Sequence, residues 1–291
     1  MTRKTTRLRQ VLAAEGPLLV PGAYDGASAR VVEAVGAEAV YLTGFGMEAS
    51  MLGMPDIGLA SEAEVVAHAG RIADAVSVPV ISDADTGYGG AINVHRTVRD
   101  FERRGIAGIH IEDQVLPKRC GGLAGRRVVP EDEMLARLHA ALGARRDPDF
   151  VVIARTDAKA TEGLDAAIAR LNAYLAAGAD LAMIAEPHSL DELRRLCREV
   201  DGPVTMVGGV PDWPESMLSH AAYAEIGVKL VLYAVTGLSA ALQVQMRIYR
   251  DLLENGALGP ESTAAMMGLE DVANLMGLAD WTAVEETATR S

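Results

Sequence analysis

The regular alternation of short apolar runs with amphipathic stretches constrains the fold of this chain more than any other feature. Eight runs have the length and apolar character of buried strands, and apolar residues at helical spacing fill the segments between them. Eight strands, each followed by a helix, in 291 residues predict a (β/α)₈ barrel, the TIM barrel of the α/β class. The expected strands cover residues 18–20, 39–42, 78–82, 108–111, 150–154, 181–184, 204–207 and 230–233. The expected helices include residues 27–35, 62–75, 94–104, 131–142 and 164–176.

An open, doubly wound sheet is the alternative arrangement of such elements. The sequence does not favour it, because no G-x-G-x-x-G motif opens a helix after the first strand. No linker, low-complexity tract or long charge run divides the chain, so we expect one domain over residues 1–291. Its last part, residues 240–291, is largely helical, and we expect a C-terminal extension that packs on a neighbouring subunit.

Charge and composition narrow the range of partners. The formal net charge of -13 argues against nucleic acid and against an anionic membrane surface. It is compatible with a small anionic substrate, because a metal ion and a few arginines reverse the charge locally. Two cysteines indicate a reducing compartment rather than a disulfide framework. Neither a signal peptide nor an apolar stretch of about 20 residues is present, so we expect a cytoplasmic protein.

Two aspartates, Asp83 and Asp85, directly follow the buried run 78–82 and precede a glycine-rich loop. Alternation along the end of a strand places both on one face. Hard oxygen ligands beside a flexible loop suit Mg²⁺, which binds through few carboxylates. Read alone, the pattern is also that of two solvated aspartates in a loop.

Acidic residues recur at other expected strand ends, where the chemistry of a barrel is placed. Asp56 follows the second strand and Glu112 the fourth, while Arg155 follows the fifth. Helix capping or neutralisation of a neighbour explains Asp113 and Asp157, but it is a poor explanation for the four acids together, which predict a bound cation. Arg155 would clamp a carboxylate or, alternatively, form a structural ion pair.

Two further segments belong to the same end of the predicted barrel. Residues 43–46, Thr-Gly-Phe-Gly, form a turn that either aims N–H groups at an anion or is a plain tight turn. Residues 117–127 are basic and glycine-rich, and we expect a lid whose cations lower the pKa of Cys120. The alternative is an exposed basic loop with an incidental cysteine. Cys197, in a helical run, is expected to be inert.

Several long motifs in order resemble the isocitrate lyase/phosphoenolpyruvate mutase superfamily, over nearly the whole chain. The nearest branch is that of 2-methylisocitrate lyase, dimethylmalate lyase and carboxyphosphonoenolpyruvate phosphonomutase. The motifs are PGAYD at 21–25, LGMPD at 52–56, DADTGYG at 83–89, IEDQ at 111–114, KRCG at 118–121 and ARTDA at 154–158.

The resemblance implies a barrel whose last helix is swapped between subunits, in a tetramer built from dimers. It implies Mg²⁺, with Mn²⁺ as an alternative, and C–C cleavage of a 2-hydroxy di- or tricarboxylate through an enolate. The implied metal ligands are Asp83, with Asp56, Asp85 and Glu112. The implied catalytic residues are Cys120, which protonates the enolate, Arg155 and Glu112. The implied substrate contacts are Tyr41, Thr43, Gly44, Phe45, Asp83, Lys118, Gly121 and Arg155.

The departures from the family pattern concern proton transfer rather than the metal. Gly122 stands where the lyases have a histidine, and Gly208 replaces a glutamate. After the sixth strand the family has a glutamate followed by an alanine, whereas this chain has Ala185 followed by Glu186. Phe45 replaces a small residue beside the substrate. A lyase is the first hypothesis, and an oxaloacetate-type decarboxylase or hydrolase is the second because it needs fewer such groups. A phosphonomutase, disfavoured by Phe45, and a catalytically silent metabolite binder are the others.

Overall fold

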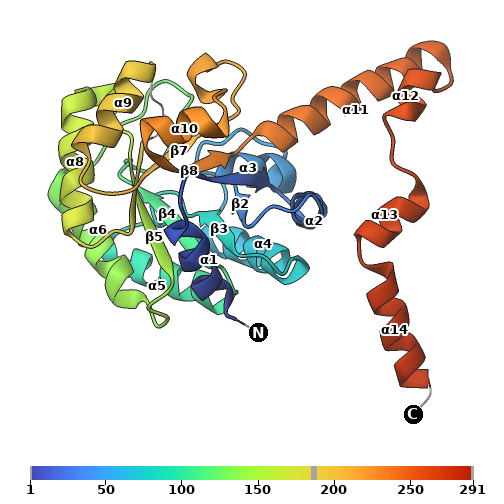
Figure 1. Cartoon of the computed structure of the whole chain (residues 1–291), viewed down its shortest axis with the longest axis horizontal. Coiled ribbons are helices and arrows are strands. Elements are labelled where there is room, and N and C mark those ends of the chain that lie inside the picture. The colour runs from blue at the N-terminus through green and yellow to red at the C-terminus, as the bar shows by residue number, and fades with distance from the viewer. Residues whose placement is uncertain (1, 185–188, 290–291) are drawn as a thin grey trace.

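The chain folds as a closed barrel of eight parallel strands, as the sequence predicts (Figure 1). The structure, a computed structural model, describes residues 2–184 and 189–289. Strands pair in chain order, and β1 closes the barrel against β8. The strands are β1 (Leu18–Ala23), β2 (Val40–Leu42), β3 (Val80–Asp83), β4 (Gly108–Glu112), β5 (Val151–Thr156), β6 (Leu181–Ile184), β7 (Val204–Val207) and β8 (Val228–Tyr233).

Helices surround the barrel, and the five predicted ones are present with ends that shift by three residues or fewer. The helices that were not predicted include α1 (Lys4–Ala13), which precedes the first strand, and α3 (Gly44–Leu52), which begins directly after the second. The remaining helices of the barrel are α2 (Gly26–Ala34), α4 (Glu62–Ala75), α5 (Ala91–Arg103), α6 (Glu131–Ala144), α7 (Lys159–Glu162), α8 (Leu164–Ala176), α9 (Leu190–Glu199), α10 (His220–Ile226) and the 3₁₀ turn η1 (Pro214–Ser216).

Side-chain caps mark where several of these helices begin. Asp25 and Ser61 each form a capping box with the residue three positions later, at the starts of α2 and α4. Ser189 and Ser219 accept from backbone N–H groups at the starts of α9 and α10. These polar residues end the preceding loops and fix the point at which each helix packs onto its strand.

Alternation along the strands separates two apolar layers. Side chains such as Val20, Ile81, Ile153 and Leu230 fill the interior of the barrel, and α1 adds Leu8 to this cluster. The opposite faces of the strands pack against the helices in a larger cluster. The interior is therefore a packed core rather than a pore, and it supports the polar groups above it.

The C-terminal part leaves the barrel as an arm (Figure 1). The long helix α11 (Thr236–Asn255) projects away from the strands, and α12 (Pro260–Ala264), α13 (Leu269–Leu275) and α14 (Leu278–Thr289) follow it. Beyond α11, the arm contacts the barrel through α13, which packs on α2. Within the described residues, no helix has both the length and the apolar character needed to cross a membrane.

Candidate active site

The polar mouth of the barrel continues the inward-facing rows of the core. Ile81 faces the interior, so Asp83, two residues later on β3, faces the mouth. In the same way Ile153 is followed by Arg155 on β5. Register places neighbouring strand ends side by side, with Glu112 of β4 opposite Arg155. The predicted convergence of acids and an arginine from successive strands is confirmed for Asp83, Glu112 and Arg155.

Asp83 is the hub of the acidic group. Its Oδ1 accepts from the Asp85 N–H at 2.9 Å, and its Oδ2 accepts from the Gly44 N–H at 3.2 Å. His110 Nε2 lies 3.4 Å from Oδ1 and 2.7 Å from the Tyr41 hydroxyl. Asp85 itself has φ of 46°, a left-handed conformation that is strained for a non-glycine residue and clusters at functional sites.

Segment 43–46 differs from the turn that the sequence predicts. Thr43 is the N-cap of α3, and its hydroxyl accepts from the Gly46 N–H. The N–H of Gly44, in the first turn of the helix, points at Asp83. A Cβ at Gly44 would lie 2.6 Å from Asp83 Oδ2, so only glycine brings the helix this close. The N–H thus points at a carboxylate of the protein. Its contact with a substrate anion stays a prediction.

Asp56 reaches the mouth because a buried glutamate holds its loop. Glu48 of α3 accepts three backbone N–H groups, those of Ile57 at 3.2 Å, Leu59 at 2.7 Å and Ala60 at 3.0 Å. Glu48 is not among the residues that the sequence predicts for the site. The signal was its place four residues after Gly44 on a helix whose other residues are apolar or small.

Lys118 supplies a positive charge between the acids. Its ammonium pairs with Asp56 and lies 2.7 Å from Asp85 Oδ1, and its side chain is almost fully buried. The sequence assigned Lys118 to the substrate, whereas its contacts here are with the acids. Burial would lower the pKa of Lys118, but Asp85, Asp56 and Asp83 outweigh it and raise the pKa well above its ordinary value.

The positive charge of Lys118 and Arg155 does not fully compensate the carboxylates of this group. Burial, opposed by Lys118 and reinforced by Asp83 and Asp56, raises the pKa of Asp85 to about 7. Burial, opposed by Arg155 and reinforced by Asp157, raises the pKa of Glu112 well above its usual range. Glu112 Oε1 is buried without a hydrogen-bond partner. Among the residues that the structure describes, no three His, Cys, Asp or Glu side chains are arranged to hold a metal ion. Lys118 stands between Asp56 and Asp85.

Arg155 forms the structural ion pairs that the sequence left as its alternative role. Its Nε and Nη2 contact the two oxygens of Asp157 at 3.0 and 3.1 Å, and Nη1 contacts Glu112 Oε2 at 3.0 Å. Asp113 accepts from Thr156, Tyr174 and the Asp157 N–H, so Asp113 and Asp157 are the structural acids that the sequence indicates. Arg155 still lines the cavity above it, at 7% exposure.

The mouth opens into a cavity of about 430 Å³, and most of the predicted substrate contacts line it. They are Tyr41, Thr43, Phe45, Asp83, Gly121 and Arg155, joined by Asp56 and Cys120. Four predicted residues are buried beneath this surface and are not part of the lining: Gly44, Asp85, Glu112 and Lys118.

The basic loop is folded over the mouth, as a lid would be. A bridge between Gln114 and Val128 closes its base. The Gln114 amide holds Arg119 through two backbone bonds of 2.8 and 2.9 Å, and the Cys120 N–H donates to the Asp56 carbonyl at 3.0 Å. These contacts tie the lid to the acidic group and place the thiol in the cavity wall.

The expected lowering of the Cys120 pKa is wrong. Burial, reinforced by Asp56, raises the pKa of this thiol to about 11. The basic side chains of the loop point elsewhere: Lys118 to Asp56 and Asp85, Arg126 to Asp157, and Arg119 to the Ala124 carbonyl. The thiol is therefore protonated at neutral pH. Burial also raises the pKa of Cys197, to about 11, as expected of an inert residue.

One wall of the cavity was missed by the sequence analysis. The loop after β7 contributes Val210, Pro211, Asp212 and Trp213, and the lid contributes Leu123. The βα loops of a barrel all meet at the mouth, so their position was the available signal. Gly208, where the family pattern has a glutamate, is closely packed: a Cβ there would lie 2.6 Å from Val231 Cγ1. Ala185 and Glu186 lie outside the described residues.

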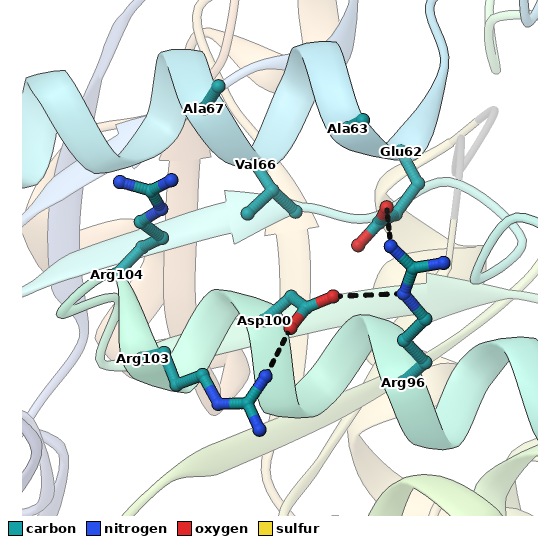
Figure 2. A pocket seen from close by; sticks show the side chains of 8 residues that line it. All are labelled: Glu62, Ala63, Val66, Ala67, Arg96, Asp100, Arg103 and Arg104. Carbon is teal, nitrogen blue, oxygen red and sulfur yellow. Dashed lines mark hydrogen bonds and ion pairs between the residues drawn. The ribbon is translucent and has the colours of Figure 1, made fainter.

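A second hollow, of about 480 Å³, lies on the outside of the barrel between α4 and α5 (Figure 2). Most of its charged side chains pair with one another: Asp100 contacts Arg96 at 3.2 Å and Arg103 at 2.8 Å, and Arg96 lies 4.0 Å from Glu62. Since it is formed by helix faces rather than strand ends, it is separate from the acidic mouth.

The family model described as phosphoenolpyruvate phosphomutase matches residues 8–253. The chain belongs to this family. It is thereby a member of the isocitrate lyase/phosphoenolpyruvate mutase superfamily that the motifs predict, and its curated relatives include several lyases. A 2,3-dimethylmalate lyase of Eubacterium barkeri is 38% identical over 272 residues, which cover 94% of this chain and 93% of the relative.

Solved structures of similar proteins agree over the whole chain. An oxaloacetate acetylhydrolase in complex with 3,3-difluorooxalacetate superposes with a TM-score of 0.92 at 33% identity, covering 98% of this chain and 97% of the other. A phosphonopyruvate hydrolase in complex with oxalate and Mg²⁺ gives a TM-score of 0.88 at 30% identity, covering 98% and 99%. The family thus includes enzymes that act on small carboxylates by different reactions.

Proposed function

We propose that this protein is a Mg²⁺-dependent lyase that cleaves a C–C bond in a small 2-hydroxy carboxylate of the 2-methylisocitrate or dimethylmalate kind. One observation carries the proposal: a half-buried, protonated thiol and a group of buried acids border the same cavity. Cleavage needs a base that takes the proton of the substrate hydroxyl, which would be a carboxylate of the acidic group, and a proton donor for the enolate that leaves. The cavity offers both.

The donor set fits a hard divalent cation. Asp83, Asp85, Asp56 and Glu112 present carboxylate oxygens, and Glu112 Oε1 is buried without a partner. Lys118 lies between Asp56 and Asp85, so it would shift when a metal ion is bound by these acids. A bound Mg²⁺ would supply positive charge for the oxyanion that develops on cleavage. Mn²⁺ would offer the same chemistry.

The residues of the chain would divide the remaining tasks. Thr43, Phe45 and Gly121 border the space for the substrate. Arg155 also lines the cavity, and its guanidinium is held in place by ion pairs with Asp157 and Glu112. Cys120 would deliver its proton to the enolate carbon after the C–C bond breaks, because its raised pKa keeps it protonated until then. The lid excludes water, which would otherwise compete as a proton donor.

A hydrolase or decarboxylase of an oxaloacetate-like acid is the second candidate, and one observation favours it. Gly122 and Gly208 carry no proton-transfer group, and the packing around Gly208 leaves no room for one without rearrangement. Such a reaction depends less on acid and base side chains than a lyase does. A phosphonomutase fits less well, because Phe45 narrows the cavity beside the mouth.

A panel assay separates these functions. The purified protein would be incubated with 2-methylisocitrate, 2,3-dimethylmalate, citramalate and oxaloacetate, each with Mg²⁺ and with a chelator. We expect Mg²⁺-dependent release of a 2-oxo acid from at least one 2-hydroxy acid. Turnover of oxaloacetate alone would favour the second candidate, and binding without any turnover would indicate a silent metabolite binder.

A further inference from the structure

Apolar side chains from three parts of the chain line the cavity. Phe45 comes from α3, Leu123 from the lid, and Val210 and Trp213 from the loop after β7. The charged lining residues Asp56, Asp83 and Arg155 belong to the mouth, and Asp212 belongs to the loop that carries Trp213. A substrate in the cavity therefore meets both apolar and charged side chains.

Hydrogen bonds hold the backbone of Trp213 in a turn. Its backbone N–H donates to the Val210 carbonyl at 2.9 Å, and its backbone carbonyl accepts from the Ser216 N–H and hydroxyl at 2.8 and 2.7 Å. Ser216 is buried, so it anchors this turn to the barrel. The indole faces the lid: a Cβ at Gly122 would lie 3.5 Å from Trp213 Cζ2. The absence of a side chain at Gly122 leaves this space to the indole.

Positive charge is scarce along the lining. Among the described lining residues, Arg155 alone carries a cationic side chain, and it already contacts Glu112 and Asp157. The nearby ammonium of Lys118 is directed at Asp56 and Asp85. The polar residue next to Trp213 is Asp212, which would repel an anion. A carboxylate placed against this wall would find no free cationic partner among the described lining residues.

We propose that Trp213, seated over Gly122, selects substrates that carry an apolar substituent and rejects those that carry a third carboxylate. This inference rests on the proposed function for the orientation of the substrate, with its carboxylates toward the strand ends. It narrows the substrate class to alkyl-substituted 2-hydroxy dicarboxylates. Trp213 and Leu123 would pack on the alkyl groups, and each buried methyl group favours binding.

Binding of unreactive analogues tests this inference without any turnover. The affinities of 2,3-dimethylsuccinate and tricarballylate, an alkylated dicarboxylate and a tricarboxylate, would be measured by titration calorimetry in the presence of Mg²⁺. We expect the alkylated dicarboxylate to bind about 10-fold or more tightly, the range typical of one or two apolar groups in a fitted pocket. Equal affinity, tighter binding of tricarballylate, or no binding of either compound would overturn the inference.

Variants test whether Trp213 causes the binding preference. Trp213→Ala should bring the ratio of the two affinities close to one, while Trp281→Ala, at an exposed tryptophan of the C-terminal arm, should leave it unchanged. Circular dichroism would verify folding, and Trp213→Leu, which keeps an apolar wall, should retain the preference. An unchanged ratio in Trp213→Ala would contradict the role of Trp213.

The two proposals fail in different ways. If no 2-hydroxy acid is turned over but the binding preference is intact, the result would count against the lyase and not against the selectivity of Trp213. Mg²⁺-dependent cleavage that is faster for a tricarboxylate would support the lyase and contradict the selectivity of Trp213.

Discussion

Side chains at the mouth combine buried carboxylates with too little positive charge. Lys118 and Arg155 are each shared between two acids, and Glu112 Oε1 is left without a partner. Buried polar groups are normally satisfied, so such an atom marks either strain or a bound ion. This residue-level imbalance is the physical reason for proposing a divalent cation.

Cys120→Ser tests the proton donor. The hydroxyl keeps the shape of the side chain but is a far weaker acid, so kcat should fall by about 10²-fold or more with KM little changed. Cys197→Ser, at the other cysteine, which lies in α9, should keep wild-type kcat. Steady-state kinetics on a confirmed substrate gives both values. An unaltered kcat in Cys120→Ser would remove the thiol from the mechanism and favour the hydrolase or decarboxylase.

The raised pKa of Asp85 predicts how pH affects the metal-free protein. The folded state retains this proton up to about pH 7, whereas the unfolded chain loses it near 3.8, the ordinary value. The folded state thus binds more protons between these limits, and the contribution of Asp85 to stability falls as pH rises from about 4 to 7. Chemical denaturation in chelator should show a shallower fall for Asp85→Asn than for the wild type. Parallel curves would contradict the assignment.

Metal binding should show the opposite trend with pH. Asp85 must lose its proton to hold Mg²⁺, so affinity should rise from pH 6 to pH 8. The increase in melting temperature caused by a fixed Mg²⁺ concentration measures this. Ca²⁺-free and Mg²⁺-free blanks at each pH control for the effect of pH itself. A thermal shift that is larger at pH 6 would be inconsistent with Asp85 as a ligand.

Among the elements, α3 does more to build the site than its sequence suggests. Its first turn brings the Gly44 N–H to Asp83, and its second turn carries Glu48, which holds the Asp56 loop. Both contacts join residues that are close in space but come from different strands and loops. One short helix therefore sets the separation of two of the acids.

Gly44→Ala should disturb this placement without unfolding the barrel. The added methyl group would lie 2.6 Å from Asp83 Oδ2, so the helix or the carboxylate must move, at a cost of about 1–3 kcal/mol. We expect activity to fall at least about 10-fold, in line with the sensitivity of catalysis to small misplacements. Gly143→Ala, where a Cβ meets nothing within 4 Å, is the matched control. Equal activity of both variants would contradict the role of α3.

The elements were predictable where one local pattern decides them. Apolar runs and helical periodicity located all eight strands and the main helices, because burial imposes these patterns directly. The start of α3 was not predictable in this way, since Gly44 and Gly46 are typical of a turn. Contacts in space explain them, because Gly44 packs against Asp83 and Gly46 packs against Tyr24 and Thr43. The direction of Lys118 and the packing of Trp213 also depend on loops folding together, which no local pattern reports.

At the scale of the whole molecule, the C-terminal arm lacks partners for its apolar side chains. Leu253, Leu269 and Trp281 are 83, 87 and 70% exposed, on α11, α13 and α14 of an arm that projects from the barrel. Exposed apolar surface of this extent marks an interaction site. We propose that the arm packs on a second copy of the chain, so that the single domain of residues 1–291 functions as a homo-oligomer, a dimer or a dimer of dimers.

Analytical ultracentrifugation tests this assembly. The wild type should sediment as an oligomer at micromolar concentration, and Leu253→Glu with Leu269→Glu should shift it toward monomer, because buried charge at an interface is unfavourable. Ile92→Glu places the same charge at an exposed residue of α5 on the barrel and should leave the oligomer intact. A monomeric wild type would refute the proposed role of the arm.

The central claim is that the acids at the barrel mouth hold a metal ion that makes C–C cleavage possible. Proton NMR would follow 2,3-dimethylmalate, a 2-hydroxy dicarboxylate with apolar substituents, with wild type and Asp83→Ala, each with Mg²⁺ and with a chelator. Asp191→Ala, at an exposed aspartate of α9, is the control, and circular dichroism verifies folding. We predict 2-oxo acid formation by wild type and Asp191→Ala with Mg²⁺ and loss of it in chelator and in folded Asp83→Ala. Full cleavage by Asp83→Ala, or by wild type in chelator, would contradict the account.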